Sequence, residues 1–464
     1  MNQRPALRLR QPNRLELIPS LVLDKALPDD HPVRTIWAYV TTVNLDAFLE
    51  RIRAVEGRPG RNATDPRLLL AVWMYATTEG IGSARWLDEF CRDHTAYRWL
   101  CGGVTLNYHT LSDFRKDFEA ELDELMIDHI SALMHQGLVD LKRVAQDGMR
   151  VRANAGAASF RRGQTIEECQ KEVAEQLALL KDQVDDAPGA AGRRSRAARQ
   201  RHLEEKAVRL EEAKKVAAEL EAKRAERLRE HPKEAAKEAG KDPAKKAGRG
   251  STTDPQARHM KMPDGGYRPA YNVQAATTTA EGLIVAIAVT NQGTDVGLMG
   301  PMIDQIEESY GKAPEEMLND GGFMSVEDVE AAAAKDVDVY MPLRDEKKEL
   351  AAGKDPYAAK KGDKAGMKGL RARMGTQEAK KIYKERASTA EWVNAGMRNR
   401  GLYQFLVRGV NKVRAVALMQ ALVHNLFTTI RLCGEKKLVR SWTEILRAGL
   451  EGIKKDGQMA VARG

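Results

Sequence analysis

The strongest constraint on the fold is the order of strand-like and helix-like segments between residues 271 and 343. Two runs of strand-type composition, YNVQAATT (271–278) and GLIVAIAVT (282–290), are close enough in sequence to pair as a β-hairpin. A helical segment, DVGLMGPMIDQIEESYG, follows; then come a strand in EEMLND, a helix in SVEDVEAAAAKD and a strand in VDVYMPL. A further strand is expected earlier, at 142–152. The chain therefore predicts three strands followed by alternating helices and strands.

That order is the order of the ribonuclease H-like fold. Residues 30–140 instead show apolar residues at helical spacing, as in DPRLLLAVWMYATTEG and ELDELMIDHISALMHQGLV. We expect an α+β protein, with a helical N-terminal domain followed by a ribonuclease H-like α/β domain that a helical coiled hairpin interrupts. The expected boundaries are 1–140 for the helical domain, 141–163 and 251–432 for the α/β domain, 164–250 for the hairpin and a basic linker, and 433–464 for a C-terminal tail.

The expected hairpin has heptad-like apolar spacing in two stretches. Val173, Leu177, Leu180 and Val184 are separated by steps of four and three, and similar steps recur from Leu203 to Leu220. DDAPGAAG is expected to form the turn between them, and His231-Pro232 is expected to end the second helix. Farther along, residues 343–375 are expected to be irregular and Gln377–Arg400 helical, and KVRAVALMQALVHNLFTTIRL is expected to be the final amphipathic helix.

The N-terminal helices include a candidate helix-turn-helix. SARWLDEFCRDHTAYRWL is followed by a break at CGGVTLN and then by YHTLSDFRKDF. If this arrangement binds DNA, the residues expected to face the groove are Thr110, Ser112, Arg115 and Lys116. A plain helical bundle is the alternative.

Composition points to a polyanionic partner and to a reducing compartment. Lys and Arg number 75 against 66 Asp and Glu, a net charge of +9, which favours binding to phosphate backbones. The four cysteines are scattered without a C-x-x-C pair, which argues against a zinc ribbon or a disulfide framework. No run of about 18 apolar residues and no secretory leader is apparent. We expect a cytoplasmic protein with no membrane partner.

Three acidic residues occupy positions that suit a metal-dependent phosphoryl transfer site. Asp147 lies inside an expected strand, where a buried acid is costly unless paired or bound to metal. Asp320 ends another strand and precedes Gly321 and Gly322, while Glu391 lies on the long helix after the last strand. Hard cations such as Mg²⁺ take oxygen ligands, and two of them can stabilise the attacking and leaving oxygens at one phosphorus.

Several long segments resemble the DDE transposases of bacterial insertion sequences, in the group with a Tyr, Arg, Glu, Lys signature on the catalytic helix. The segments are VAQDGMRVRANA, STTDPQARHMKMPDGGYRPAYNVQAAT, MLNDGGFMS and YKERASTAEWVNAGMRNRGLYQFLVRGVNKVRAVALMQALVHN, and the SDFR segment resembles the N-terminal domain of such enzymes. The resemblance implies that Asp147, Asp320 and Glu391 are the catalytic, metal-binding acids.

The same resemblance matches Tyr383, Arg386 and Arg398 to the Tyr, Arg and Lys of the signature, as DNA-binding residues. Arg398 departs from the usual lysine, and its guanidinium would contact phosphate as a planar fork. Glu391 and Arg398 are seven residues apart and share a helix face, whereas Arg386 lies about 140° from Glu391 around the helix.

The resemblance further implies the cofactor, the partners and the reaction. Two Mg²⁺ ions, which Mn²⁺ can replace, would support cleavage at terminal inverted repeats and joining of the 3′-ends to target DNA. The partners would be the element ends, the target DNA and further copies of the chain, as a homodimer or higher oligomer on DNA, associated with the bacterial nucleoid. The alternatives are a structure-selective nuclease on the same fold and an inactive relative that only binds DNA.

Three residues have competing interpretations, and a fourth, Asp295, has one expected role. Glu385 is an alternative to Glu391 as the third acid, although the signature spacing is then lost. Asp254 is either a neighbour of the metal site or the cap of a turn, and Asp295 is expected to cap the N-terminus of its helix. Trp392 either stacks on a base near the cut end or belongs to the core.

Overall fold

The computed structural model describes residues 23–463 except 53, 55–61, 183–189 and 234–246. The first elements are helices: η1 (Leu23–Ala26), α1 (Pro32–Thr42), α2 (Asp46–Glu50), α3 (Pro66–Thr78), α4 (Ala84–Asp93), α5 (Thr95–Cys101), α6 (Tyr108–Asp117) and α7 (Glu119–His135). Helix α5 ends at Gly102, which adopts the left-handed conformation, and the Asn107 side chain caps α6 by accepting the N–H of Thr110. The expected order of helix, glycine turn and second helix is therefore present.

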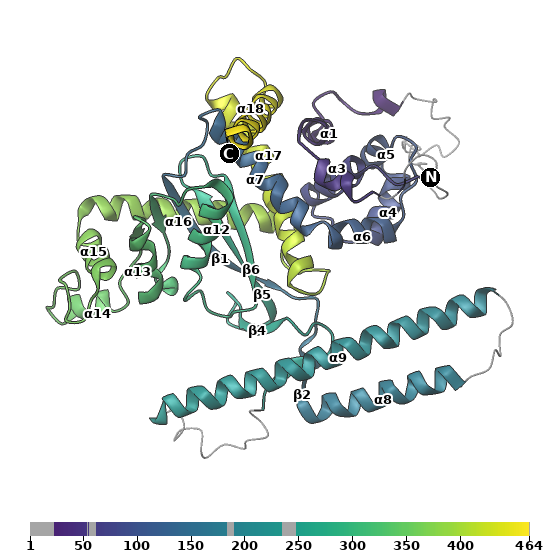
Figure 1. The fold of residues 1–464 in the computed structure, drawn as a ribbon, viewed down its shortest axis with the longest axis horizontal. Coiled ribbons are helices and arrows are strands. Elements are labelled where there is room, and N and C mark those ends of the chain that lie inside the picture. Colours follow the sequence, from purple (N-terminus) through teal and green to yellow (C-terminus); the bar gives the residue numbers. More distant parts are fainter. Residues whose placement is uncertain (1–22, 53, 55–61, 183–189, 234–246, 464) are drawn as a thin grey trace, which may run out of the picture.

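One hydrophobic core joins these helices to the sheet, and helix α17 (Val410–Glu435) lies between them (Figure 1). Helix α17 packs against α3, α6 and α7 and also against strands β5 and β6. Helix α17 is long and apolar enough to cross a membrane. However, 72% of its apolar 18-residue window is buried inside the protein, as in the core helix of a soluble protein.

The C-terminal segment contains one more helix than the sequence suggests. The region expected to be a tail contains α18 (Trp442–Arg463), which packs against α7 and α1. Gly449 permits this contact, because a Cβ there would lie 2.4 Å from the carbonyl oxygen of Ala132. The expectation that α17 is the final helix was wrong.

The central sheet has six strands: β1 (Arg143–Arg152), β4 (Arg258–Lys261), β5 (Tyr267–Thr278), β6 (Ile284–Thr290), β7 (Glu316–Leu318) and β8 (Asp338–Tyr340). Strand β5 is antiparallel to β1 and to β6, whereas β7 is parallel to β1 and β8 is parallel to β7. Strand β4 pairs with the start of β5, on the edge that β6 continues. A meander of three strands followed by two parallel strands confirms the ribonuclease H-like arrangement.

The coiled hairpin is also present, and it projects from the sheet (Figure 1). It consists of α8 (Gly163–Asp182) and α9 (Ala190–Glu230), and strands β2 (Phe160–Arg162) and β3 (Arg249–Ser251) pair at its base. The two helices have a small core of their own, separate from the main core, formed by Ile166, Val173, Leu203, Leu210, Ala213 and Ala217. Gly248 and Gly250 cross α9 so closely that a Cβ at either would lie 2.1 Å from a backbone oxygen of α9.

Helices connect and follow the later strands: α12 (Met299–Tyr310), η3 (Gly321–Phe323), α13 (Val326–Ala334), α14 (Glu346–Ala351), α15 (Ala365–Met374) and α16 (Gln377–Asn399). A further short turn, η2 (Ala157–Ser159), precedes β2. Helices α14 and α15 correct the expectation that residues 343–375 are irregular. The buried side chains of Met367, Leu370 and Met374 share one face of α15, which packs against α13.

Candidate active site

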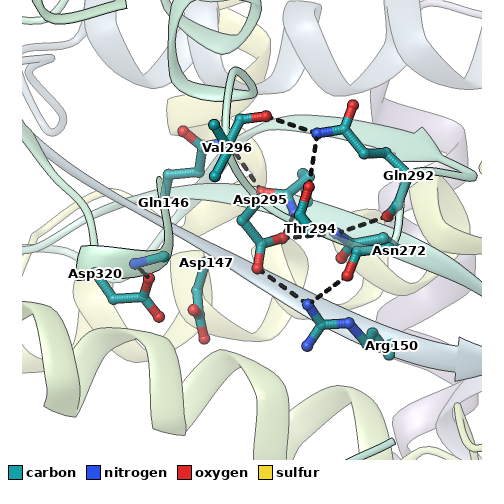
Figure 2. A network of polar contacts seen from close by, with 12 residues as sticks. Gln146, Asp147, Arg150, Asn272, Gln292, Thr294, Asp295, Val296 and Asp320 are labelled. Atoms are coloured by element: carbon teal, nitrogen blue, oxygen red, sulfur yellow. Dashed lines mark hydrogen bonds and ion pairs between the residues drawn. The ribbon is translucent and has the colours of Figure 1, made fainter. Parts of the chain in front are cut away.

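Asp147 on β1 and Asp320, two residues after the end of the parallel strand β7, lie at the same level. Strand β1 pairs with β7 so that Ala145 is opposite Leu318. Asp147 and Asp320 each follow this pair by two residues, so the pairing brings the two carboxylates together near the carboxyl end of β7. Asp320 also accepts the N–H of Gly322 at 2.7 Å, which fixes the turn after β7. Figure 2 shows the two carboxylates next to each other.

Helix α16 provides the partners of this acid pair. One guanidinium nitrogen of Arg386 lies 2.7 Å from Oδ1 of Asp147 and 3.4 Å from Oδ2 of Asp320. Asn394, two turns farther along, donates its amide N–H to Oδ2 of Asp147 at 2.8 Å. Arg386 therefore lies where the two acids face each other, and Asn394 is a contact that the sequence analysis missed.

Burial and charge act together on Asp147. Burial raises the pKa of Asp147, the Arg386 guanidinium lowers it, and the nearby Asp320 carboxylate raises it again. Burial also raises the pKa of Tyr383, and the Asp320 and Asp147 charges act in the same direction. Two carboxylates this close repel each other unless a cation lies between them, so the site is built to hold positive charge.

Two side chains of the site, Asp147 and Asp320, are suitable ligands for a divalent cation. Carboxylate oxygens are the ligands that Mg²⁺ and Mn²⁺ prefer, and the two acids converge on a point that a guanidinium now occupies. Within the described part of the chain, no group of three acidic, His or Cys side chains is close enough to hold a metal ion. Asp147 and Asp320 are thus the two candidate ligands that the structure brings together.

Glu391 lies on α16 but outside this contact. Its side chain is exposed, and it precedes Asn394 by three residues, so it lies about 60° around the helix from Asn394. Arg398 is half-buried and follows Asn394 by four residues, on the same stripe. Glu391 and Arg398 therefore lie on the side of α16 that bears Asn394.

The rival acids have other partners. Glu385 binds the guanidinium of Arg143 at 2.7 and 2.9 Å and accepts the hydroxyl of Thr279 at 2.9 Å, away from Asp147. Asp254 is 1% exposed and accepts the hydroxyl of Tyr271 at 2.8 Å. Neither rival acid contacts Asp147 or Asp320 in the described structure.

The face of β1 opposite Asp147 carries a buried polar network (Figure 2). Asp295 accepts hydrogen bonds from the amides of Asn272 and Gln274, and its other oxygen lies 3.3 Å from Arg150. The expectation that Asp295 caps its helix was wrong, because α12 begins after Leu298 and the Asp295 carboxylate is committed to this network. Gly148 packs directly against it, since a Cβ there would lie 2.4 Å from Gln274 and 2.6 Å from Asp295.

All four residues expected to face the DNA groove lie on α6, among them Arg115 and Lys116. Arg115 does not project from the surface as expected: it is 8% exposed, donates to the carbonyl of Gly82 and covers the ring of Trp73 at 4.3 Å. Burial lowers its pKa to about 10. Lys116 is half-buried and pairs with Asp113 at 2.6 Å. The apolar surroundings of Trp73 hold the Arg115 stem inside the helical domain, which helical spacing alone did not reveal.

Trp392 has both a packed and an open side. The ring is 43% exposed, meets His424 edge-on at 4.6 Å and lies 5.3 Å from the guanidinium of Arg431. Gly282 provides room for it, because a Cβ there would lie 2.3 Å from the ring. The residue is therefore neither fully core nor freely exposed.

The fold and the acid pair define a ribonuclease H-like protein with a candidate phosphoryl transfer site. Two family models match the chain: Transposase domain (DUF772) over residues 21–117, and Transposase DDE domain over residues 361–429. The two matches support a transposase of the DDE type, from an insertion sequence. Tyr383, Arg386, Glu391 and Arg398 fall inside the second match, whereas Asp147 and Asp320 lie outside it. Neither the curated proteins nor the solved structures give a match to the chain.

Proposed function

We propose that this transposase cleaves DNA at the terminal inverted repeats of its insertion sequence and joins the 3′-ends to target DNA, using Asp147, Asp320 and Glu391. The observation that carries the proposal is the contact of one Arg386 nitrogen with both Asp147, on β1, and Asp320, just after the parallel strand β7. The match of a DDE transposase domain to the helix that provides Arg386 supports it.

Asp147 and Asp320 would hold divalent cations, Mg²⁺ or Mn²⁺, with Glu391 as the third ligand. Bound cations would stabilise the negative charge that develops at the phosphorus. Asn394 orients the Asp147 carboxylate through Oδ2, and Arg386 lies within reach of a phosphate that approaches the pair. Arg398 and Tyr383 extend the same surface of α16 and would bind the DNA strand beside the cut.

Both chemical steps would exchange one oxygen for another at phosphorus. Water first attacks the phosphodiester at the element end, which breaks the P–O3′ bond and leaves a 3′-hydroxyl. That hydroxyl then attacks a phosphodiester of the target, forms the new P–O3′ bond and displaces the target 3′-oxygen. Two ends must be held together for this reaction, which is why we propose a homodimer or higher oligomer on DNA, acting at the nucleoid in the cytoplasm.

The test is amide substitution of each acid. Asp147→Asn, Asp320→Asn and Glu391→Gln remove the charge but keep the size, so each should nearly abolish cleavage of end DNA and leave binding close to unchanged. Glu378→Gln, at an exposed position in the first turn of α16, is the matched control and should cut normally. Mg²⁺-dependent cutting by any one acid variant would remove that residue from the site, and loss of cutting in Glu385→Gln would favour Glu385 as the third acid.

Metal dependence and joining are tested with the same DNA. Mg²⁺ and Mn²⁺ should support cleavage, whereas Ca²⁺ should permit binding without turnover. Cleavage that persists after complete chelation would contradict the metal mechanism. Incubation with end DNA and a plasmid target separates a transposase, which joins, from a nuclease on the same fold, which only cleaves.

A further inference from the structure

A groove lies where the N-terminal helices, the coiled hairpin and the α/β domain meet. It has a volume of about 910 Å³ and is lined by α6, α9, residues 253–256 and residues 406–412. We call it the three-part groove. It is distinct from the acid pair, because Asn154 at its edge follows Asp147 by seven residues, or about 23 Å along an extended strand.

The groove carries an excess of positive charge. Five basic and three acidic side chains line it: Arg115, Lys116, Arg209, Arg408 and Lys412 against Glu205, Glu212 and Asp254. Arg408 and Lys412 are exposed and Asp254 is buried, whereas the two exposed acids of the groove, Glu205 and Glu212, lie on α9. An anionic ligand would therefore bind on the side of the groove that Arg408 and Lys412 form.

The N-terminus of α17 also opens into the groove. Asp254 accepts the N–H of Gly409 at 3.3 Å, and Gln256 accepts the N–H of Val410 at 2.6 Å. The next two N–H groups, of Asn411 and Lys412, belong to the first turn, where an α-helix provides no internal partner. Both residues line the groove, so the positive end of a 26-residue helix faces the ligand space.

Two buried donors that line the groove have no partner. The Nε–H groups of Arg115 and Arg209 are buried without a hydrogen-bond partner, although the Arg115 guanidinium also donates to the carbonyl of Gly82. A buried donor left unpaired is costly, and a ligand in the groove would offer hydrogen-bond acceptors. Unpaired donors, a helix N-terminus and a net positive charge together select an acceptor-rich anion.

We propose that the three-part groove binds the phosphate backbone of duplex DNA inside the element end, with phosphates at Arg408, Lys412 and the N-terminus of α17. The proposal rests on the proposed function, because it names where that DNA lies beyond the cut. A duplex whose end reaches Asp147 while its flank enters the groove makes this contact about seven base pairs from the end, at 3.4 Å per base pair. The coiled hairpin is then one wall of a DNA-binding site.

The test compares two double variants of the full-length protein. Arg408→Ala with Lys412→Ala removes two groove cations, and Lys347→Ala with Lys348→Ala removes two exposed cations from α14 as the matched control. The probe is a fluorescent duplex copied from the end of the DNA that flanks the gene, and binding is measured by anisotropy over a range of salt. Losing two phosphate contacts lowers the salt slope by about two, so across a fourfold rise in salt the wild-type affinity should fall about 12-fold more than that of the groove variant.

The outcomes separate the groove from the proposed function. A reduced slope in the groove variant alone, with ethylation interference lost about seven base pairs from the end, supports the groove. If the wild type binds and cuts end DNA but the groove variant keeps the wild-type salt slope, the groove proposal is overturned and the proposed function stands. A changed sedimentation coefficient of the DNA-free protein, with the DNA slope unchanged, shows that the groove binds a second copy and also overturns it. A wild type that binds and cuts no end DNA overturns both.

Discussion

Gly148 lies between two polar clusters on β1, since Asp147 points toward α16 and the Asp295 network lies on the opposite face. A Cβ at Gly148 would lie between 2.4 and 2.9 Å from polar atoms of Gln274, Asp295 and Asn272. These side chains are held by hydrogen bonds on a central sheet, so they have little freedom to move aside. The glycine therefore fixes how closely β1 approaches the network, and with it the position of Asp147.

We expect Gly148→Ala to lower the free energy of unfolding by about 1–3 kcal/mol, the usual effect of overpacking a core. Cleavage should fall as well, because β1 must shift to relieve the contact. Gly156→Ala is the control, since nothing lies within 4 Å of a Cβ there and its φ is negative. Urea unfolding measures the free energy of unfolding of both variants. If Gly148→Ala is as stable as wild type, the side chains of the Asp295 network can move aside without cost.

Arg386 occupies the point on which Asp147 and Asp320 converge, so it competes with any cation for that point. Arg386→Ala should therefore bind Mn²⁺ more tightly than wild type, by roughly tenfold if about 1.4 kcal/mol of competing interaction is lost. Cleavage should decrease, because the guanidinium that would bind the phosphate is missing. Isothermal titration with Mn²⁺ measures the first effect, with the exposed Lys384→Ala as control. Weaker Mn²⁺ binding in Arg386→Ala would show that the guanidinium supports the acids instead of competing with a metal.

At the scale of elements, the coiled hairpin has its own core and is separate from the main one. Replacing residues 164–240 with a short Gly/Ser linker should leave a folded, monodisperse protein, since loop closure costs grow slowly with length. DNA affinity and paired-end joining should fall, because α9 is one wall of the three-part groove. Size-exclusion chromatography and thermal melting come first, then paired-end joining beside single-end nicking. Aggregation of the deletion variant would show that the coiled hairpin belongs to the main core. Normal paired-end joining would show that the hairpin does not have the proposed role.

Most elements could be predicted from the sequence because their apolar spacing decides them. The strand with Asp147, the pair β5 and β6, and α13 with its Ser325 cap were expected where they lie. Helices α14 and α15 were not, because their charged and glycine-rich sequence has little apolar periodicity, and α15 is stabilised by tertiary packing against α13. Helix α18 was missed because short-range pattern does not show that Gly449 fits against Ala132.

The candidate site was predicted unevenly, for a geometric reason. Strand register places Asp147 beside Asp320, because Asp147 lies on β1 and Asp320 follows β7, and the sequence pattern reveals both strands. The partner from α16 depends on the rotation of that helix about its axis, which spacing alone does not define. Asn394 therefore faces Asp147 although no motif marked it, and Glu391 lies about 60° to the side. For the same reason Arg115, chosen for its place on α6, faces inward.

At the scale of the whole molecule, His129 connects the N-terminal helices to α17. Its ring nitrogens lie 3.0 Å from the hydroxyl of Tyr39 and 2.9 Å from that of Thr429, and burial lowers its pKa to about 3. The pKa of His129 is lower in the folded than in the unfolded state. Its contribution to the free energy of unfolding is therefore complete only above the unfolded pKa, near 6.5. As the pH falls below that value, the unfolded chain takes up a proton that the folded chain does not.

We expect this residue to destabilise the protein by about 2 kcal/mol at pH 5 relative to pH 7.5. His129→Gln lacks the titration, so its free energy of unfolding should decrease by about 2 kcal/mol less than that of wild type over the same interval. The comparison cancels other titrating groups, such as Asp128, whose pKa burial raises to about 6. Urea unfolding at the two pH values measures it, and parallel losses in both proteins would show that His129 is protonated without cost.

The position of the coiled hairpin also bears on how the chain folds. Asp147 pairs with Ala275, so the central pairing of the sheet joins residues 128 positions apart. Helices α8 and α9 lie side by side, and Phe160 pairs with Ser251 at their base, which brings the two flanks of the insertion together. Once this local unit has formed, β1 and β5 need to close only about 30 residues of chain, which lowers the entropic cost by about 1 kcal/mol. Low contact order speeds folding, so the insertion that separates the two strands in sequence shortens the search by which they meet.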